Sequence, residues 1–582
     1  MQTQINNLQW LIGGEAGFGI KVTGQMFSRM CVRGGLFTFD YTEYPSLIRG
    51  GHNSYQVDVR DHPMFSSVRP IDLLVALNQD SIVQHADRLS PCAGIVFDPD
   101  AKDTNVSVFD GKDIQLCSVP LTKLAREAGG TILMRNVVAL GASVGLLQYD
   151  LDLLLSVLHT AFDRKGQKTV NENIHAAKAG YAYARDHLEP FPWKLERKHE
   201  AKKHIALQGN AAIALGAIQA GCKFFAGYPM TPATSILTLL ARHAEKTGMV
   251  VRHAEDEISV INEAIGASYA GVRSMIATSG GGFALMTEGV GLAGMTEVPL
   301  VIVVAQRPGP STGLPTWTSQ ADLQFVLHAG QDELPRIVLA PGDARECFYA
   351  TVQAFNLADK YQTPVFILTD KFLGESQATI EPFTTDHLTR DRGALNYVPQ
   401  QGENGLYDRY RITADGISPR TIPGMPGGVH TANSDEHDAI GSVDESAENR
   451  IAMMEKRMKK LETARSDIPV PTLYGSAVAD LTLVCWGSTK GPAIDAMEQL
   501  AQQGTTVNVL HFVYLHPLPI VKVTGVLRHC RNTLLLENNY SGQFARHLMT
   551  DVGFQPEHTL LRYDGRPFFA DEIAQKALSV LE

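Results

Sequence analysis

The sequence of 582 residues is poor in three features that point to particular classes of protein: clustered cysteines, long apolar runs and excess positive charge. Its seven cysteines are scattered, so we expect buried free thiols in a reducing compartment and no iron–sulfur cluster held by this chain alone. The most apolar stretch, residues 299–305, is far shorter than the roughly 20 residues of a membrane-spanning helix. The formal net charge of −11 argues against a nucleic acid as the main partner, because phosphate binding needs a basic surface.

The N-terminus and the overall composition indicate a globular protein of the cytoplasm. The first residues, MQTQINNLQW, contain no basic segment followed by an apolar one, so we predict no signal peptide and no membrane partner. Hydrophobic residues make up 44% of the chain and charged residues 19%, which is an ordinary globular balance. At roughly 100–200 residues for each domain, the length predicts three or four domains.

Three regions alternate short apolar runs with helical periodicity, and this alternation predicts an α/β fold. The first region ends in a stretch rich in proline and charge, residues 191–203, which we interpret as a linker. Residues 384–470 are dense in Gly, Pro, Asp and Ser and predict an irregular connection, in which one charged helix covers residues 451–463. We expect strands at residues 8–12, 35–40, 71–76, 94–97, 249–253, 274–278, 299–305, 336–339, 364–369, 481–486, 506–512 and 533–536.

Several short motifs follow the expected strands of the middle region. The motif Tyr-Pro-Met-Thr-Pro at 228–232 precedes a helical pattern, so Pro232 is expected in the first helical turn with Thr231 as the cap. Acidic residues at 255–257 open the next helix, at a strand end where open α/β sheets bind ligands. An ordinary strand–turn–helix junction and a first-turn acid that complements the helix dipole are the alternative explanations.

Two further motifs of this region favour a ligand. Three consecutive glycines, Gly280 to Gly282, permit positive φ and the close approach of another molecule. Arg307 lies in a Pro/Gly-rich loop at the end of a buried strand, which suits a two-point contact with a carboxylate, and a surface salt bridge is the alternative.

The N-terminal region carries a weaker signal. Residues 13–19, Gly-Gly-Glu-Ala-Gly-Phe-Gly, approximate a dinucleotide-binding fingerprint, and Asp40 follows about twenty residues later. Alone, this pattern indicates a phosphate-bearing cofactor such as NAD. Arg49, Gly50 and Gly51 add a cation and a second flexible turn nearby.

Together, these segments resemble the 2-oxoacid:ferredoxin oxidoreductase family. YPMTP resembles the family's Tyr-Pro-Ile-Thr-Pro motif, with Met at position 230. HAEDEISVINEAIGASYAG followed by TSGGGFALM resembles its pyrimidine-binding domain, and QRPGPSTGLPT resembles its substrate-arginine loop. ENNYSGQFA at 537–545 resembles its transketolase-like C-terminal domain. GGEAGFG with SLIRGGH resembles its gamma domain, here at the N-terminus.

The resemblance implies three α/β domains. They are a gamma domain at 1–195, a pyrimidine-binding domain at 203–383 and, after the connection at 384–470, a transketolase C-terminal-like domain at 471–582. The order gamma-then-alpha resembles the large alpha subunit of two-subunit enzymes, often of the 2-oxoglutarate type.

The resemblance also implies the chemistry. A 2-oxoacid and coenzyme A become an acyl-CoA and CO2 with the help of thiamine diphosphate, and electrons leave through a 4Fe–4S cluster to ferredoxin. In the reverse direction the same enzyme fixes CO2. We expect 2-oxoglutarate and succinyl-CoA as substrate and product. Pyruvate or a branched-chain or aryl 2-oxoacid is the alternative substrate, because the motifs contact groups that all 2-oxoacids share.

Site residues carry over motif by motif. The resemblance implies that Glu257 activates the cofactor, with Glu255 as the fallback, and that Arg307 binds the substrate carboxylate. The remaining implied contacts are Thr231 beside the substrate, Tyr228 and Pro229 along the thiazolium side of the cofactor, and Arg49, Gly50 and Gly51 at coenzyme A.

The family's Gly-Asp-Gly motif, which holds Mg²⁺ and the diphosphate in thiamine enzymes, is absent from this sequence. We therefore expect a beta subunit that carries Mg²⁺ and the 4Fe–4S cluster and shares thiamine diphosphate with this chain, which itself holds no metal. A dimer of alpha–beta heterodimers is the expected assembly. An NAD-dependent dehydrogenase is an alternative from another class, but it leaves YPMTP and the arginine loop unexplained. A non-catalytic assembly subunit is a third alternative.

Overall fold

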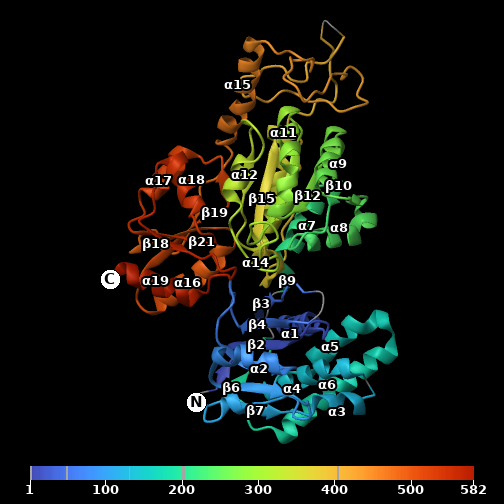
Figure 1. Cartoon of the computed structure of the whole chain (residues 1–582), viewed down its shortest axis with the longest axis vertical. Helices are drawn as coiled ribbons and strands as arrows, with labels where there is room; N and C mark the ends of the chain where they lie inside the picture. The colour runs from blue at the N-terminus through green and yellow to red at the C-terminus, as the bar shows by residue number, and fades with distance from the viewer. Residues whose placement is uncertain (1–2, 48–49, 130, 199–202, 403–404) are drawn as a thin grey trace. The chain divides into compact units, whose positions relative to one another are not determined.

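The computed structural model describes residues 3–47, 50–129, 131–198, 203–402 and 405–582, and they form two compact units (Figure 1). Unit 1 comprises Met1–Leu207 and Glu375–Phe383, and unit 2 comprises Gln208–Gly374 and Thr384–Glu582. Each unit contains at least one large sheet with parallel strands and helices against it. The predicted α/β fold class is therefore confirmed, while the division into domains at 195, 203, 383 and 470 remains a prediction.

The eight-stranded sheet of unit 1 is parallel in one half and antiparallel in the other, in the order β7-β6-β5-β2-β4-β3-β16-β9. β2 pairs parallel with β5, but its other neighbour, β4, is antiparallel. Its strands β9 and β16 flank the Gln208–Gly374 segment of unit 2 in the sequence. The strands are β2 (Leu8–Glu15), β3 (Phe37–Glu43), β4 (His52–Arg60), β5 (Ile71–Ala76), β6 (Leu89–Phe97), β7 (Gln115–Ser118), β9 (Ile205–Gln208) and β16 (Gln377–Ile380).

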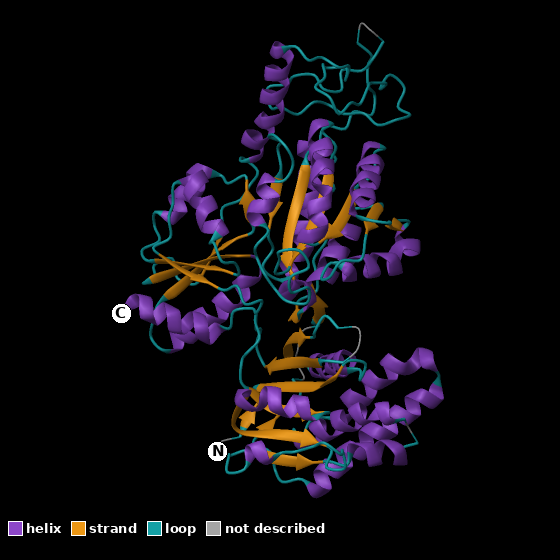
Figure 2. Ribbon diagram, in the orientation of Figure 1, coloured by secondary structure: helices purple, strands orange, loops and turns teal. Residues whose placement is uncertain are grey.

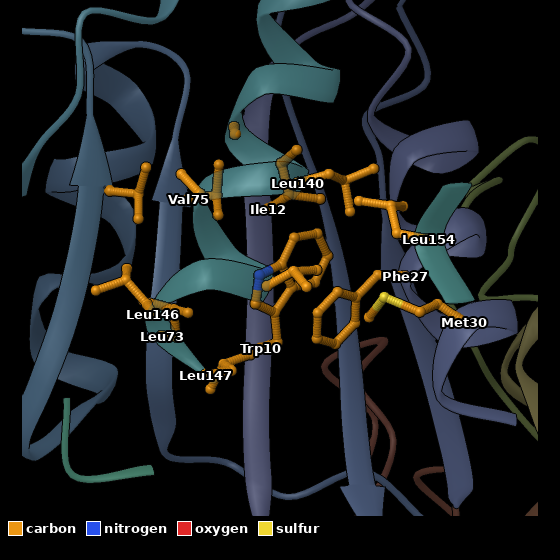
Figure 3. Packing of buried hydrophobic residues seen from close by; sticks show 14 of the residues in the cluster. Trp10, Ile12, Phe27, Met30, Leu73, Val75, Leu140, Leu146, Leu147 and Leu154 are labelled. Carbon is orange, nitrogen blue, oxygen red and sulfur yellow. The ribbon is translucent and has the colours of Figure 1, made fainter. Parts of the chain in front are cut away.

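Most helices of unit 1 pack on this sheet around one core (Figure 3), and Ile82 belongs to a second, smaller cluster. Trp10 of β2 stacks on Phe27 of the first helix, with ring centroids 4.3 Å apart. The indole nitrogen of Trp10 donates to Ser143 Oγ at 3.1 Å, so the polar atom of this buried ring is satisfied. The helices are α1 (Ile20–Arg33), α2 (Gln79–His85), α3 (Leu121–Glu127), α4 (Arg135–Leu146), α5 (Leu151–Phe162) and α6 (Gln167–His187).

Unit 2 is built on a seven-stranded sheet in the order β11-β10-β12-β13-β15-β14-β20. All neighbouring pairs are parallel except the last, in which β20 runs antiparallel to β14. The strands are β10 (Phe224–Gly227), β11 (Val250–His253), β12 (Ser274–Thr278), β13 (Leu300–Gln306), β14 (Ile337–Leu339), β15 (Pro364–Asp370) and β20 (Tyr514–His516). The helices include α7 (Gly209–Gln219), α8 (Thr234–Thr247), α9 (Glu257–Tyr269), α10 (Gly280–Phe283), α11 (Thr287–Met295), α12 (Leu323–His328) and α13 (Ala344–Tyr361).

A second sheet of unit 2 has the order β17-β19-β18-β21-β22. Its middle strands β19, β18 and β21 are parallel, as predicted, and the sequence analysis missed β17 and β22 at the edges. One continuous core joins it to the seven-stranded sheet. The elements are β17 (Thr472–Tyr474), β18 (Leu481–Trp486), β19 (Val507–Phe512), β21 (Thr533–Glu537), β22 (His558–Leu561), α16 (Lys490–Gln502), α17 (Ile520–Leu527), α18 (Gln543–Val552) and α19 (Ala570–Leu581).

The segment before α15 (Ala447–Ala464) is irregular, as predicted, and Figure 2 shows it as loops. Buried charges hold it to the rest of unit 2. The Asp359 carboxylate of α13 pairs with Arg273 at 2.8 Å, with Arg420 at 2.5 Å and with Arg392 at 3.1 Å, and the last two arginines belong to the irregular segment.

Helix α15 is held in the same way. Its Lys456 and Lys460 both place Nζ 2.6 Å from the carboxylate of Glu297, and all three side chains are almost fully buried. The charge of the two lysines holds the pKa of Glu297 well below its usual range although burial opposes this. Burial in turn lowers the pKa of Lys460 to about 8.

The linker predicted at 191–203 begins too early. Phe191, Trp193 and Leu195 are only 3%, 5% and 2% exposed, and Trp193–Lys194 forms strand β8, which pairs with β1 (Gln4–Ile5). Pro192 and Lys194 separate these three apolar residues, so every second side chain is buried. This alternation is typical of a strand with one buried face, but the proline and the charges around it are also typical of a linker. Residues 199–202 lie outside the described part of the chain.

Among the described residues, no single helix combines the length and apolarity needed to cross a membrane. Among these same residues, one bent pair of helices, Leu121–Glu127 with Ile132–Leu146, meets the two criteria by its length and composition.

Helices α4 and α6 approach so closely that glycine is required between them. A Cβ on Gly141 would lie 2.0 Å from the carbonyl oxygen of Ala177, and one on Gly180 would lie 2.0 Å from that of Val138. We predict that Gly141→Ala destabilises the protein by about 1–3 kcal/mol, because the two helix backbones must separate. Urea unfolding measures the change.

The matched control is Gly525→Ala in α17, where a Cβ would meet no atom within 4 Å. This change should be neutral or stabilising by about 0.5–1 kcal/mol, because alanine favours the helix. Equal effects of the two substitutions would show that the helix contact does not require glycine at 141.

Candidate active site

The motif loops of the middle region lie at one edge of the seven-stranded sheet. Strands β11, β10, β12 and β13 are parallel neighbours, so their carboxyl ends face the same way. The loop beginning at Tyr228 follows β10, the acidic stretch follows β11, the glycine turn follows β12 and Arg307 follows β13. Ligands of open α/β sheets bind at this edge.

Glu257 is the first residue of α9 and is 4% exposed, whereas Glu255 is exposed. The preceding Asp256 caps the helix, because its side chain accepts the Ser259 backbone N–H at 2.8 Å. This cap directs the Glu257 side chain into the protein. Its Oε1 atom is buried and has no hydrogen-bond partner. A buried acceptor is rarely left unpaired, so this oxygen is a site for a donor from outside the described residues.

Neighbouring side chains, two carboxylates and the Thr278 hydroxyl, leave no room for a Cβ at two of the three glycines of the glycine turn. None of Gly280, Gly281 and Gly282 has positive φ, so a left-handed backbone does not explain these glycines. A Cβ on Gly282 would lie 2.7 Å from Glu257 Oε1, and one on Gly280 would lie 2.6 Å from Asp322 Oδ2. The outer glycines thus make room for side chains of the same chain. Gly281 is exposed, and a Cβ there would make an ordinary contact of 3.8 Å with the Ser311 carbonyl oxygen.

Arg307 and Asp322 face each other beside this turn. Arg307 Nη1 donates to the carbonyl oxygen of Thr231 at 2.8 Å, which joins the loops after β10 and β13. Burial lowers the pKa of Arg307 and raises the pKa of Asp322 to about 6, while their mutual attraction opposes both shifts. Asp322 Oδ2 has no hydrogen-bond partner. The sequence analysis missed Asp322, because an acid before a short helix is typical of an ordinary cap.

The loop after β10 differs in detail from its prediction. Helix α8 begins at Thr234 and Ala233 occupies the N-cap without a side-chain bond, so the expected cap at Thr231 and the first-turn place of Pro232 are wrong. Asn210 Nδ2 instead holds the turn by donating to the carbonyl oxygen of Pro232 at 2.8 Å. Tyr228 is 39% exposed, and its neighbour Pro229 is exposed as well.

The loop after Arg307 is fixed to the end of β21 by Gln320. Gln320 is fully buried, and its side chain accepts from Asn538 N at 2.9 Å and donates to the Trp486 carbonyl oxygen at 2.7 Å. Its backbone N–H donates to Asn538 O at 2.8 Å, and its carbonyl oxygen accepts from Asn539 Nδ2 at 3.0 Å. The stretch ENNYSGQFA is therefore a docking surface for this loop, a role that its sequence did not indicate.

Glu537, the last residue of β21, is the buried acid of that stretch. Its Oε1 accepts hydrogen bonds from Trp486 Nε1 at 3.1 Å, Asn539 Nδ2 at 2.9 Å and Phe544 N at 2.9 Å. Complete burial nevertheless raises the pKa of Glu537 to about 7, above the usual 4.5.

The N-terminal glycine motif lies in unit 1. Gly13 and Gly14 belong to β2 rather than to a loop, and β4 separates β2 from the strand that follows α1. A dinucleotide fingerprint requires a strand–helix–strand unit with parallel strands, so this arrangement counts against the NAD alternative. Gly50 and Gly51 have φ of 76° and 80°. Arg49 lies outside the described residues.

One edge of a parallel sheet thus carries a buried unpaired carboxylate, an exposed glycine and an arginine. This arrangement is typical of a ligand-binding α/β protein. Two family models match this chain. The model described as "Pyruvate flavodoxin/ferredoxin oxidoreductase, thiamine diP-bdg" covers residues 215–456, and "Pyruvate ferredoxin/flavodoxin oxidoreductase" covers residues 9–183.

Relatives match over almost the whole length. The 2-oxoacid:ferredoxin oxidoreductase subunit alpha of Saccharolobus solfataricus is 32% identical over 99% of this chain and 98% of its own. The 2-oxoglutarate oxidoreductase subunit KorA of Mycobacterium tuberculosis is 30% identical over 98% and 91%. A solved structure of the 2-oxoglutarate:ferredoxin oxidoreductase from Magnetococcus marinus, with 2-oxoglutarate, coenzyme A and succinyl-CoA bound, is 33% identical with a TM-score of 0.92 over 99% of this chain and 100% of that one. This chain belongs to the family of 2-oxoacid:ferredoxin oxidoreductase alpha subunits.

The raised pKa of Glu537 makes the stability of the protein depend on pH. Its pKa is raised in the folded protein, so its contribution to stability is fully present below about pH 4.5 and is lost as the pH rises through about 7. Glutamine cannot ionise and loses nothing over this window. We predict that Glu537→Gln destabilises the protein less at pH 8.5 than at pH 4.5, by up to about 3 kcal/mol.

Urea unfolding of the variant and of wild type at both pH values measures this difference. Glu455→Gln, a change at an exposed glutamate of α15, serves as the control and should show the same effect at both pH values. An effect of Glu537→Gln that does not change with pH would contradict the raised pKa.

Proposed function

We propose that this chain is the alpha subunit of a 2-oxoglutarate:ferredoxin oxidoreductase. The enzyme would interconvert 2-oxoglutarate, coenzyme A and oxidised ferredoxin with succinyl-CoA, CO2 and reduced ferredoxin, and two electrons would pass to the acceptor one at a time. The full-length similarity to the Magnetococcus marinus enzyme, which binds 2-oxoglutarate, coenzyme A and succinyl-CoA, carries this proposal. The strand-end site supports it, because its acid, glycine and arginine suit a cofactor and an anionic substrate.

The residues at the sheet edge fit one side of thiamine diphosphate. Glu257 offers a ring nitrogen a buried oxygen that is unpaired among the described residues, and the exposed Gly281 has no side chain. Tyr228 and Pro229 supply exposed apolar surface at the end of β10. When bound, thiamine diphosphate supplies a nucleophilic carbon and an electron sink for decarboxylation. Because the sequence lacks Gly-Asp-Gly and clustered cysteines, the proposal assigns Mg²⁺ and the 4Fe–4S cluster to a beta subunit, in a dimer of heterodimers.

Each residue of this chain then has a defined task. Glu257 binds the cofactor ring and holds or releases a proton at Oε1. Arg307 binds the carboxylate that every 2-oxoacid carries; one of its nitrogens is used by the Thr231 carbonyl, and the rest of the guanidinium remains for the substrate. Asp322 has a raised pKa and acts electrostatically on Arg307, so its protonation state changes the net charge of the substrate site. Gly50 and Gly51, with Arg49, remain proposed contacts to coenzyme A.

A less selective 2-oxoacid:ferredoxin oxidoreductase is the second candidate. The Saccharolobus solfataricus relative is named for 2-oxoacids in general, and both family models are named for pyruvate. Ferredoxin reduction by the complex with its beta subunit, measured with 2-oxoglutarate, pyruvate and 2-oxoisovalerate, decides between them. We expect the highest kcat/KM with 2-oxoglutarate. A value with pyruvate or 2-oxoisovalerate that equals or exceeds it would overturn the substrate assignment and leave the family unchanged.

Glu257→Gln should lower kcat of the assembled complex by about 10²–10⁴-fold, because glutamine keeps the shape of the side chain but cannot transfer a proton. Oxoacid-dependent ferredoxin reduction at saturating thiamine diphosphate measures the effect. Glu255→Gln is the matched control, and its exposed side chain should tolerate the change. A large loss with Glu255→Gln and none with Glu257→Gln would place the activating acid two residues earlier.

Arg307→Met should weaken 2-oxoacid binding. A charge-assisted hydrogen bond contributes roughly 1.5–3 kcal/mol, which corresponds to a rise in KM for the oxoacid of about 10- to 150-fold. Arg307→Lys should recover only part of this, since an ammonium group cannot make the planar two-point contact. The KM for coenzyme A is the internal control. Unchanged kcat/KM for the oxoacid in the methionine variant would refute the assignment.

A further inference from the structure

Two histidines and an aspartate of unit 2 converge where β20 meets α18. His516 is the last residue of β20, and His547 and Asp551 lie four positions apart on one face of α18. One donor atom from each residue lies within 4.8 Å of the other two. The Asp551 carboxylate is 3.8 Å from His516 Nδ1 and 3.6 Å from His547 Nδ1.

These distances are too long for hydrogen bonds, so the three groups do not satisfy one another. His516 Nδ1 is buried and has no hydrogen-bond partner. His547 Nε2 donates to the Leu515 carbonyl oxygen at 2.8 Å, and this bond leaves the Nδ1 lone pair of a neutral ring facing the carboxylate. Two lone pairs that face each other across 3.6 Å repel unless a cation lies between them.

A cation placed between the three donor atoms satisfies these acceptors. Arg465 acts electrostatically on Asp551, and its charge weakens the binding of a further cation there.

We propose that His516, His547 and Asp551 bind a Zn²⁺ ion. Two neutral imidazoles and one carboxylate suit a divalent first-row metal, whereas Mg²⁺ and Ca²⁺ prefer six or more oxygens. Donors about 2.0–2.1 Å from a tetrahedral Zn²⁺ are about 3.3–3.4 Å apart. The two histidine–aspartate distances of 3.6 and 3.8 Å are a few tenths of an ångström longer, and all three donors lie within 4.8 Å, so binding draws the three side chains together. The carbonyl that orients His547 is the kind of second-sphere partner that metal-binding histidines have.

The ion joins two parts of unit 2. β20 is the edge strand of the seven-stranded sheet, and α18 begins at Gln543. Gln543 donates to the Ala321 carbonyl oxygen at 2.7 Å and accepts from Gln324 N at 2.9 Å, next to the loop that carries Arg307. The metal therefore stabilises the helix that anchors this loop. The side chains of His516 and Asp551 are 20% and 22% exposed, which leaves a path for the ion.

The test uses the full-length chain after chelator treatment, titrated with Zn²⁺ or Co²⁺ alone. We expect one equivalent of Zn²⁺ with a dissociation constant of about 1 µM or below, and a melting temperature several degrees higher with the metal. Bound Co²⁺ should show visible d–d bands of a four-coordinate nitrogen/oxygen site and no thiolate charge-transfer band, which excludes the seven cysteines as ligands. Mg²⁺ in large excess should not compete.

Asp551→Asn and His516→Gln should each weaken Zn²⁺ binding by at least about 10-fold and abolish the metal-dependent rise in melting temperature. His529→Gln is the matched control, because His529 is exposed and follows α17 outside the cluster. The proposal is overturned if the wild-type chain takes up no Zn²⁺, if Co²⁺ reports sulfur ligands, or if both variants bind Zn²⁺ as wild type does. The cobalt spectrum of the wild-type chain gives this answer even if a variant fails to fold.

Discussion

The candidate site depends on how one buried amide, that of Gln320, fixes a long loop. Gln320 uses four hydrogen bonds, two from its side chain and two from its backbone, to join the loop to the ends of β18 and β21. In a buried position each unmade bond would cost about 1–3 kcal/mol, so the complete set strongly favours one loop position. That position places Arg307 against the loop after β10 and Asp322 against Gly280. The second sheet therefore contributes to the site by holding the arginine loop of the first.

Buried charges perform a similar task for the part of the chain that has little regular structure. Glu297 and Asp359 each attract two or three cationic side chains, most of them from residues 384–470. A buried pair adds little net stability over an apolar contact, but removing one partner leaves an uncompensated charge and costs about 3–5 kcal/mol. Such pairs select one packing arrangement for a segment that lacks the repeated backbone bonds of helices and sheets. Helix α15 contributes two such pairs, because Lys456 and Lys460 lie on one of its faces and both bind Glu297.

Local sequence patterns predicted most strands of the large sheets, because a buried parallel strand is a continuous apolar run that ends at polar or glycine residues. The same apolar runs predicted where the strands end. They therefore also predicted that Glu257 and Arg307 lie at one edge of the sheet. Patterns could not predict β16, a short edge strand that joins a sheet from a distant part of the sequence. Asp322 and Gln320 were missed for the same reason, since their importance arises only from residues brought together by folding. The glycine turn was recognised as important, but its physical reason, room for two carboxylates, required the structure.

The unpaired oxygens at the sheet edge favour the binding of a molecule that supplies hydrogen-bond donors. Glu257 Oε1 and Asp322 Oδ2 are buried acceptors that find no donor among the described residues, and they flank the same glycine turn. Leaving two such atoms unpaired costs the isolated chain about 1–3 kcal/mol each. A ligand or a second subunit that supplies N–H groups recovers this free energy only when it is bound, so the cost becomes part of the driving force for binding. The features that make the site incomplete in this chain are the same ones that give it affinity for what completes it.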